Sequence, residues 1–140
     1  MTITVEMKSS SAVIYNSSQQ VLLAKRSSSK AHDAGLWETI GGKIDSNESA
    51  VEALFREIKE ELGDKVILKN LQFYKIYNFN TNEISLKSAV YWAEIEGKIN
   101  INKSEISEVR WFNEAEALEL NYCVNCKDRV VDFFHTLSKP

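Results

Sequence analysis

The sequence predicts an α/β fold in which helices cover the faces of a mixed β-sheet. Short apolar runs typical of strands alternate along the chain with stretches of helical periodicity, and this mixture favours layers of helix and sheet. The first two apolar runs are separated by only five polar residues, which favours a hairpin of antiparallel strands. A sheet with such neighbours is expected to be mixed rather than purely parallel.

The predicted strands are short and apolar. Residues 11–15 and 21–24 form the predicted hairpin. A short extended stretch at 37–40 leads to Gly41 and Gly42, which we interpret as a turn because paired glycines punctuate regular structure. The remaining strands are predicted at 66–68, 71–79, 86–95 and 109–112.

The best-specified element is a helix that begins after Ser49. Ser49 and Glu52 form the S-x-x-E pattern of a capping box, and Gly63 stands where a glycine commonly ends a helix. Two further helices are predicted, from the cap Asn113 through Leu120 and over residues 128–137. The first helix has one predicted apolar face, formed by Val51, Leu54, Phe55, Ile58 and Leu62.

Length and composition fit one globular domain over residues 1–140. The chain is 44% hydrophobic and 26% charged, and its single Pro leaves no room for a long flexible linker. The N-terminus does not read as a signal peptide, and no apolar run approaches the roughly 20 residues that span a bilayer. Two cysteines do not make a disulfide framework. A cytoplasmic location with no membrane partner is therefore expected.

The charge balance argues against binding to a nucleic acid polymer. The net charge is −3, whereas proteins that bind duplex nucleic acid neutralise phosphates with many cations. The longest basic cluster is Lys25 and Arg26 with Lys30, which is enough for a few phosphates only. An acidic protein that acts on a polyphosphate would need a metal ion to screen the repulsion.

Three carboxylates share one stripe of the first predicted helix. If Glu57 is placed at an angle of zero around the helix axis and each residue adds about 100°, Glu61 lies at about 40° and Glu60 at about 300°. The apolar face then centres at about 110°. Glu57 and Glu61 therefore border the buried face, where burial increases the repulsion between like charges. Bound Mg²⁺ or Mn²⁺ would reverse the sign of this energy, because hard cations prefer carboxylate oxygen.

Taken alone, an E-x-x-E-E helix is most often a solvated face. Here the acids belong to a longer pattern, G-x5-E-x7-R-E-U-x-E-E-x-G, in which U is apolar. A match of this kind arises by accident in on the order of one chain in a million. Its fixed positions are Gly42, Glu48, Arg56, Glu57, Glu60, Glu61 and Gly63. The pattern resembles the Nudix box, the signature of the Nudix hydrolases.

This resemblance implies an α/β/α sandwich with a mixed β-sheet and the hydrolysis of nucleoside diphosphates linked to another group. It extends beyond the box, because residues 26–43 are similar to MutT-type triphosphatases and Glu105 precedes Trp111 as a distal glutamate does in MutT-like members. The implied cofactor is Mg²⁺, or Mn²⁺. The implied metal ligands are the Gly41 carbonyl, Glu57, Glu60 and Glu61, with Glu105 as a further candidate.

Two carboxylates compete for the role of general base. Glu57 is the first candidate because it borders the core beside the other ligands. Glu105 is the second, because family members use either a box glutamate or one from a later loop. Arg56 is expected to hold a box glutamate by a bidentate salt bridge rather than to act chemically. Glu48 either contacts the metal through water or organises the loop before the helix.

The implied substrate is a small nucleotide. A nucleoside triphosphate, ordinary or oxidised, is the leading prediction, with the monophosphate and pyrophosphate as products. The candidate substrate contacts are Arg26, Lys43 and Asn121, although Arg26 also fits a solvated strand edge and Asn121 an ordinary helix end. Thr39 and Ile40 replace an aromatic residue and a Pro of MutT-type members, which leaves base specificity open.

Other interpretations compete with this one. A Nudix fold that only senses a nucleotide would be expected to lack a box residue, and none is missing; a hydrolase of a nucleotide sugar or ADP-ribose is a further alternative. An isomerase of the isopentenyl diphosphate type usually has a degenerate box. Cys123 and Cys126 are interpreted as reduced packing residues, because zinc needs about four ligands. Many relatives are homodimers, so the resemblance also allows a homodimer.

Overall fold

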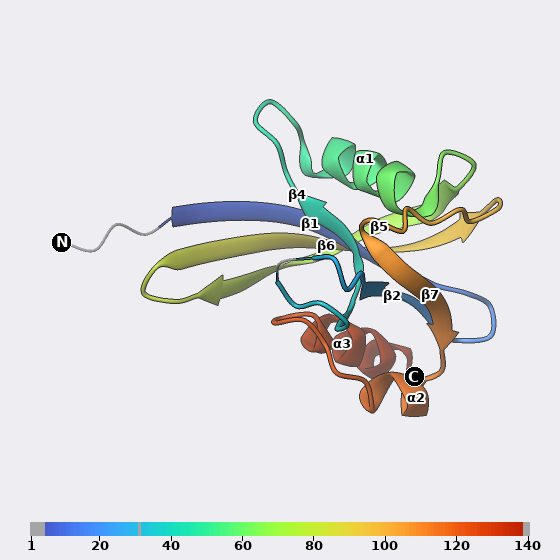
Figure 1. Cartoon of the computed structure of the whole chain (residues 1–140). Coiled ribbons are helices and arrows are strands. Elements are labelled where there is room, and N and C mark those ends of the chain that lie inside the picture. Colours follow the sequence, from blue (N-terminus) through green and yellow to red (C-terminus); the bar gives the residue numbers. More distant parts are fainter. Residues whose placement is uncertain (1–4, 31, 139–140) are drawn as a thin grey trace.

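The computed structural model describes residues 5–30 and 32–138. Strands and helices follow one another as the α/β class requires (Figure 1). The strands are β1 (Val5–Tyr15), β2 (Val21–Arg26), β3 (Trp37–Glu38), β4 (Ile40–Lys43), β5 (Ile67–Asn80), β6 (Ile84–Glu96) and β7 (Ile106–Phe112), and the helices are α1 (Ala50–Leu62), α2 (Glu114–Leu118) and α3 (Lys127–Leu137).

Strand β1 organises the sheet. It pairs with β6 in parallel and with β2 and β4 antiparallel, so the prediction of a mixed sheet is confirmed. Near the end of β1, Ile14 pairs with Leu22 of β2, which forms the predicted hairpin. Earlier along the strand, residues 9–12 pair with β4, while β2 pairs with β3 and β7. Two partners thus share one edge of β1, and β4 leads directly toward the start of α1.

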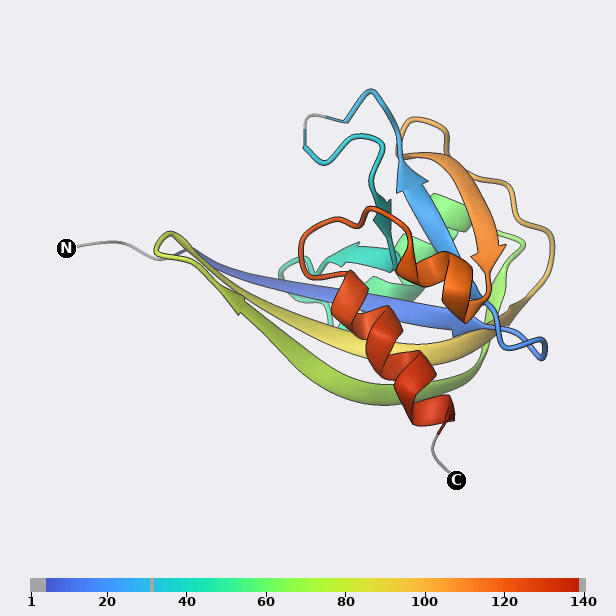
Figure 2. The ribbon, with the colours of Figure 1, turned by 90° about the horizontal axis from the view of Figure 1, so that it is seen from below.

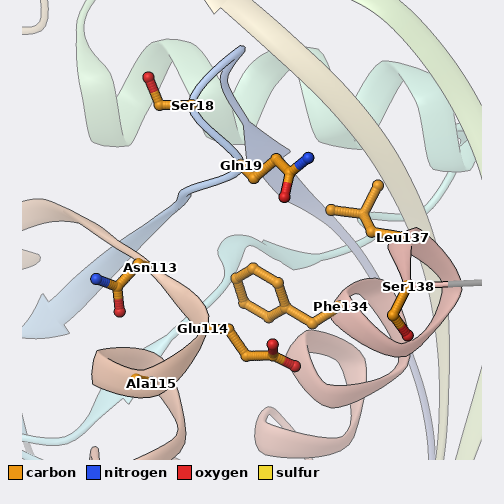
Figure 3. A pocket seen from close by; sticks show the side chains of 8 residues that line it. All are labelled: Ser18, Gln19, Asn113, Glu114, Ala115, Phe134, Leu137 and Ser138. Atoms are coloured by element: carbon orange, nitrogen blue, oxygen red, sulfur yellow. The ribbon is translucent and has the colours of Figure 1, made fainter.

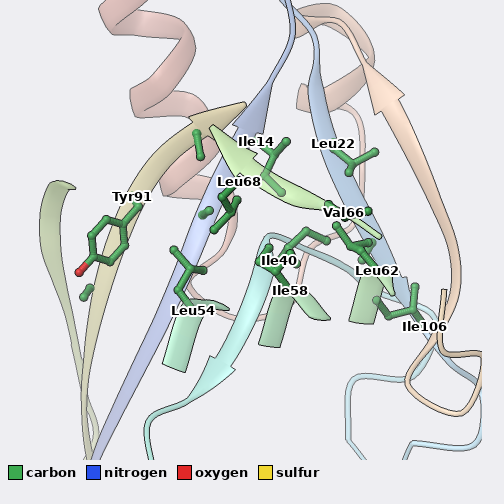
Figure 4. Packing of buried hydrophobic residues seen from close by; sticks show 14 residues of the cluster. Ile14, Leu22, Ile40, Leu54, Ile58, Leu62, Val66, Leu68, Tyr91 and Ile106 are labelled. Atoms are coloured by element: carbon green, nitrogen blue, oxygen red, sulfur yellow. The ribbon is translucent and has the colours of Figure 1, made fainter. Parts of the chain in front are cut away.

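Helices lie on both faces of the sheet, which confirms the predicted α/β/α sandwich. Helix α1 covers one face and α2 and α3 cover the other (Figure 1), and Figure 2 shows α3 lying across the strands from below. Alternate residues of β1 therefore enter different cores. Ile14 packs with Leu54 and Leu62 of α1 (Figure 4), whereas Val13 packs with Phe133 of α3.

The capping box at the start of α1 is formed as predicted. Oγ of Ser49 accepts the Glu52 N–H at 3.1 Å, and the Glu52 carboxylate accepts the Ser49 N–H at 2.9 Å. Gly63 follows the last helical residue with a φ of 96°, a left-handed conformation that favours glycine. Both ends of the helix are therefore determined by local sequence.

The predicted apolar face of α1 is wrong in part. Val51 and Phe55 are exposed, whereas the carboxylate-bearing Glu61 is buried. A helix that lies on a sheet buries one stripe only, so turning Glu61 toward the sheet turns Val51 and Phe55 toward solvent. The buried members of the stripe are Ala53, Leu54, Ile58, Glu61 and Leu62.

Two strand predictions differ most from the structure, while β7 begins at Ile106 rather than at residue 109 and the stretch predicted at 37–40 forms β3 and the start of β4. Strand β1 begins at Val5 rather than at residue 11, because its polar first half is held by pairing with β6. Strand β5 is continuous where two strands were predicted. Its register shifts between Lys69 and Gln72, and Asn70 there has a φ of 53°. The irregularity interrupts the apolar pattern without ending the strand.

The two later helices are confirmed with small differences in length. The Asn113 side chain caps α2 by accepting the Glu116 N–H at 2.9 Å, but α2 ends at Leu118 rather than at Leu120. Helix α3 begins at Lys127, one residue earlier than predicted. None of the helices within residues 5–138 combines the length and apolar character that crossing a membrane requires.

Candidate active site

The two glycines before α1 lie in strand β4, so the prediction of a turn at Gly41 and Gly42 is wrong. Pairing with β1 holds this backbone extended. A Cβ on Gly41 would lie 2.2 Å from the carbonyl oxygen of Ser10. A Cβ on Gly42 would lie 2.5 Å from Oε1 of Glu57. The glycine pair therefore permits two close approaches, Gly41 to the backbone of β1 and Gly42 to a carboxylate of α1.

The three glutamates predicted to share a stripe of α1 differ in exposure. Glu61 is buried, Glu57 is half-buried and Glu60 is exposed. The Gly41 N–H donates to Oε2 of Glu61 at 3.3 Å and so links the helix to β4. The stripe is present as predicted, and Glu61, which the helical angles placed nearest to the apolar face, is its deepest member.

Glu61 has no cationic partner among the described residues, whereas Glu57 and Glu60 share Arg56. Burial raises the pKa of Glu61 well above its usual value, and the negative charges of Glu38, Glu57 and Glu105 raise it further. Burial also raises the pKa of Glu57, while the neighbouring Arg56 guanidinium acts in the opposite direction. A positive charge placed between these groups would stabilise their ionised forms.

Arg56 joins α1 to the loop that precedes it. Its Nε and Nη2 donate to the two carboxylate oxygens of Glu48 at 2.7 and 2.9 Å, which is the bidentate geometry that the sequence predicted. Nη2 also donates to the Lys43 carbonyl at 2.9 Å, and Nη1 donates to Glu57 at 3.0 Å. Hydrogen bonds from Arg56 and the Asp45 N–H lower the pKa of Glu48 to about 2. In this structure, Glu48 organises the loop.

Glu38 is a half-buried carboxylate that was not among the predicted site residues. It lies in β3, where its Oε2 accepts from Nη1 of Arg26 at 3.3 Å and from the Cys123 thiol at 3.9 Å. Burial raises the pKa of Glu38, although Arg26 opposes the rise. Because its charge also raises the pKa of Glu61, the two carboxylates interact. The one signal in the sequence was its place in the segment similar to MutT-type enzymes.

Glu105 reaches the same site from a distant part of the chain. It lies just before β7, and its backbone carbonyl accepts the Ser27 N–H at 3.0 Å. Its carboxylate pairs with Lys30. The charge of Glu105 raises the pKa of both Glu57 and Glu61, so it lies within electrostatic range of α1. The four interacting carboxylates, called the acidic cluster below, are Glu38, Glu57, Glu61 and Glu105.

Of the three candidate substrate contacts, all in the described part of the chain, only Arg26 touches the acidic cluster. Arg26 is already engaged: it pairs with a carboxylate of the cluster, and its Nε donates to the His32 carbonyl at 3.0 Å. Lys43 is exposed at the end of β4. Asn121 is also exposed, and its backbone carbonyl accepts the Trp37 N–H at 2.9 Å. That hydrogen bond fixes the segment before α3 beside β3.

Tyr74 and Tyr77 of β5 pack with residues of α3, and the two cysteines lie in the segment that leads into this helix. The Tyr77 hydroxyl donates to Asp132 at 2.5 Å, and Tyr74 stacks on Trp92 with ring centroids 4.2 Å apart. Both tyrosine side chains are therefore engaged in contacts within the protein. Both cysteines are free and buried, as their interpretation as reduced packing residues requires.

Within residues 5–30 and 32–138, no three His, Cys, Asp or Glu side chains are arranged as a ready-made metal site. The hydrogen bonds of Arg56 give the reason. Its Nη1 binds Glu57 and also Glu60, the latter at 3.4 Å, so both carboxylates face the guanidinium. The donor set nevertheless fits a hard divalent cation, because it consists of carboxylate oxygens and because the buried Glu61 forms no ion pair with any described residue.

A pocket on the other face of the sheet is separate from this site (Figure 3). Its volume is about 360 Å³, and it lies between the turn that joins β1 to β2 and the helices α2 and α3. Among the described residues, its lining includes no member of the acidic cluster. The lining residues are Ser18, Gln19, Asn113, Glu114, Ala115, Phe134, Leu137 and Ser138.

Known proteins are similar to this chain in sequence and in fold. The NUDIX domain family model matches residues 6–132. A protein of Bacillus subtilis (strain 168), provisionally named as an 8-oxo-dGTP diphosphatase, is 31% identical over 122 residues, which cover 86% of this chain and 75% of that protein. The CTP pyrophosphohydrolase of Escherichia coli (strain K12) is 46% identical over 52 residues, which cover 37% of this chain and 38% of that enzyme.

A solved structure shows the same architecture. The crystal structure of the MutT protein from Methanosarcina mazei Go1 matches with a TM-score of 0.81 at 24% identity, and the match covers 97% of this chain and 98% of that one. The chain therefore belongs to the Nudix family, in which it is a MutT-like hydrolase.

Proposed function

We propose that this Nudix hydrolase converts a nucleoside triphosphate, ordinary or oxidised, to the monophosphate and pyrophosphate with the help of a divalent metal ion. The observation that carries the proposal is the acidic cluster, in which four carboxylates interact and the buried Glu61, beside Gly41, has no cationic partner among the described residues. A polyphosphate needs a cation between itself and such a surface. Two relatives support the proposed substrate class, since their names specify 8-oxo-dGTP and CTP.

Mg²⁺ is the proposed cofactor, with Mn²⁺ as the alternative. The proposed ligands are Glu57, Glu60, Glu61 and the Gly41 carbonyl, with Glu105 as a further candidate. Bound by these groups, the metal would neutralise phosphoryl charge and lower the pKa of a bound water. In an extended strand, the N–H and C=O of one residue point to the same edge. The Gly41 N–H points to Glu61, which supports a role for the Gly41 carbonyl.

Arg56 is proposed to position the ligands rather than to act in the chemical step. Glu57 and Glu60 would leave its Nη1 when they bind the metal. Its Nε and Nη2 would keep Glu48 and the Lys43 carbonyl in place, because those contacts are the shorter ones. Arg56 can therefore hold the loop and release two carboxylates at the same time.

Glu57 is the proposed general base, and Glu105 is the second candidate. The raised pKa of Glu57 supports this choice, because a base works best when its pKa approaches the working pH. Glu57 would take the proton of the attacking water while the bond from phosphorus to the pyrophosphate oxygen breaks. Glu105 would first have to leave its ion pair with Lys30.

The phosphate chain is proposed to contact Lys43 and Arg26. Lys43 is exposed at the end of β4, next to the loop held by Arg56. Arg26 uses its Nη1 and Nε in contacts within the protein, which leaves donors of its guanidinium for a phosphate oxygen. Asn121 is proposed to contact the base, because its segment is tied to β3 beside Glu38.

A nucleotide panel tests the proposal. The protein is incubated with Mg²⁺ or Mn²⁺ and with ordinary and oxidised nucleoside triphosphates, a nucleotide sugar and ADP-ribose, and release of pyrophosphate and phosphate is measured. We expect pyrophosphate from at least one triphosphate. Glu57→Gln should lower kcat by about a hundredfold or more. The matched control is Glu119→Gln, an exposed glutamate outside the site, which should leave kcat unchanged.

The same experiment separates the alternatives. Tight nucleotide binding without turnover of any compound would favour a sensor. Turnover of only the nucleotide sugar or ADP-ribose would favour the other hydrolases. The cytoplasmic location, the single domain over residues 1–140 and a homodimer remain predictions, of which light scattering tests the last.

A further inference from the structure

Arg129 is a buried arginine with an unused hydrogen-bond donor. It lies in the first turn of α3, and 6% of its surface is exposed. Its Nη1 donates to Oγ of Ser11 at 2.9 Å and to Oγ1 of Thr39 at 3.3 Å. Its Nε is buried without a hydrogen-bond partner. Among the described residues, no carboxylate forms an ion pair with it, so two neutral hydroxyls are the polar groups that hold this charge.

This arrangement is unfavourable unless another group completes it. A buried charge without an ionic partner is costly, and an unsatisfied buried N–H adds to that cost. A purely structural link between α3 and the sheet would not need a charge, because an apolar side chain could fill the same volume. The guanidinium has five donors and no acceptor, so the missing partner is a hydrogen-bond acceptor.

Arg129 lies across the sheet from the acidic cluster. Ser11, which it contacts, pairs with Gly41, and the Gly41 N–H donates to Glu61 on the other side. Strand β4 pairs with β1, and in the described part of the chain its second edge is unpaired. A nucleotide that lies along this edge can place its phosphates at the acidic cluster and its base toward α3. Figure 2 shows α3 lying across this face of the sheet.

The surroundings of Arg129 suit a base better than a phosphate. The Tyr77 ring lies 5.8 Å from the guanidinium carbon, the hydrogen-bond partners are the hydroxyls of Ser11 and Thr39, and the Cys126 thiol lies within electrostatic range. An aromatic wall with a few placed donors is typical of sites that bind flat organic groups. The phosphates are expected to stay on the metal side, which leaves the base as the group that can reach Arg129.

We propose that Arg129 is a specificity-determining residue that donates a hydrogen bond to a carbonyl oxygen of the substrate base. This inference rests on the proposed function, because it assumes that a nucleotide binds at the acidic cluster. A base with a carbonyl group offers the acceptor that the guanidinium lacks. A base with an amino group at the same position presents a donor and is disfavoured. The site therefore selects oxo bases over amino bases.

Matched pairs of substrates test this selection. Inosine triphosphate and ATP differ at C6, which carries an oxo or an amino group, and UTP and CTP differ in the same way at C4. We expect the wild type to favour the oxo member of at least one pair by about tenfold or more in kcat/KM. Arg129→Met should abolish the preference by raising KM for the oxo member, with kcat changed little. Arg129→Lys, which keeps the charge without the planar fork, should retain part of it.

Controls separate specificity from folding. Arg110→Met removes an exposed arginine that pairs with Glu108 on β7, and it should leave the preference unchanged. Melting temperatures show whether each variant is folded. If Arg129→Met does not fold, Thr39→Val serves as the second variant, because it keeps the guanidinium but removes one of its anchors. It should weaken the preference for the oxo member.

Binding of product nucleotides distinguishes a failure of this inference from a failure of the proposed function. Calorimetric titration with inosine and adenosine monophosphates, and with uridine and cytidine monophosphates, requires no turnover. Tighter binding of inosine or uridine monophosphate that Arg129→Met abolishes supports the inference even if no triphosphate is cleaved. Equal binding of inosine and adenosine monophosphates together with equal binding of uridine and cytidine monophosphates, or a preference that survives in Arg129→Met, overturns it.

Discussion

Glu61 of α1 accepts the Gly41 N–H of β4 at 3.3 Å, and this contact joins a buried carboxylate to the edge strand beside the helix. The geometry has an electrostatic consequence. A carboxylate that packs against a strand loses water, and one N–H replaces only part of that solvation. Burial therefore raises the pKa of Glu61, and the other members of the acidic cluster raise it further. The fold thus buries a carboxylate whose ionised form a bound cation would stabilise.

The two glycines of β4 should respond differently to a methyl group. Gly41→Ala places a Cβ 2.2 Å from a backbone oxygen of β1, at a φ of 154°, and the backbone cannot give way cheaply. We expect it to lower the free energy of unfolding by roughly 2–3 kcal/mol. Gly42→Ala meets the flexible end of Glu57 instead, so stability should change little while activity falls. Urea unfolding and kcat/KM for both variants check this, and equal effects on stability would contradict it.

Removing the charge of Glu61 should stabilise the protein and inactivate it. Glu61→Gln keeps the size of the side chain and an oxygen that can accept the Gly41 N–H. Because it removes a buried charge beside other carboxylates, we expect the free energy of unfolding in EDTA to rise by about 1 kcal/mol. Turnover should fall by about a hundredfold. Glu60→Gln is the control for stability, since Glu60 is exposed and its removal should leave the unfolding free energy unchanged.

The features of this site that could be predicted from the sequence are local ones. The capping box of Ser49 and Glu52, the helix and the stripe of carboxylates depend on spacing within a few residues, and the structure contains them. The spacing placed Glu61 nearer than Glu57 to the apolar face, and what spacing could not predict was its burial. It depends on how α1 rests on β4, and that packing also exposes Val51 and Phe55.

Contacts between segments far apart in the chain could not be predicted from local sequence patterns. Glu38 belongs to the acidic cluster because β3 brings it beside Arg26 and the segment around Cys123. Arg129 reaches Ser11 from the opposite end of the chain. Neither residue stands in a motif, and both became recognisable only through burial and the identity of their neighbours. The position of Glu105 near α1 was suggested by family resemblance rather than by its own surroundings.

The clamp formed by Arg56 should depend on its fork and not only on its charge. Lys cannot reproduce the bidentate pair with Glu48 while also reaching the Lys43 carbonyl. We expect Arg56→Lys to lower kcat/KM by about tenfold or more through a disordered loop. The Asp45 N–H, which donates to Glu48, reports on the loop directly, because its hydrogen exchange should become faster. If Arg56→Lys loses activity while the Asp45 N–H exchanges at an unchanged rate, Arg56 would instead have a chemical role.

Stability without metal should fall as the pH rises above the ordinary carboxylate range. Glu61 has an ordinary pKa of 4.5, and its pKa in the folded protein is well above that value because of burial. Between these two values the folded state binds more protons than the unfolded state, so the free energy of unfolding decreases with pH. Glu48 has the opposite sign: its pKa is lowered to about 2, so its contribution is present above 4.5 and is lost as the pH falls toward 2.

The comparison of wild type with Glu61→Gln isolates the effect of Glu61. In EDTA, the variant should gain stability over the wild type as the pH rises from 4.5, the ordinary value, through the raised folded pKa. Addition of Mg²⁺ should reduce that gain, because a cation bound by the cluster favours the ionised carboxylate of the wild type. Urea unfolding at several pH values, with and without Mg²⁺, measures both effects. A difference between the two proteins that stays constant with pH would show that Glu61 titrates in the folded protein as it does in the unfolded chain.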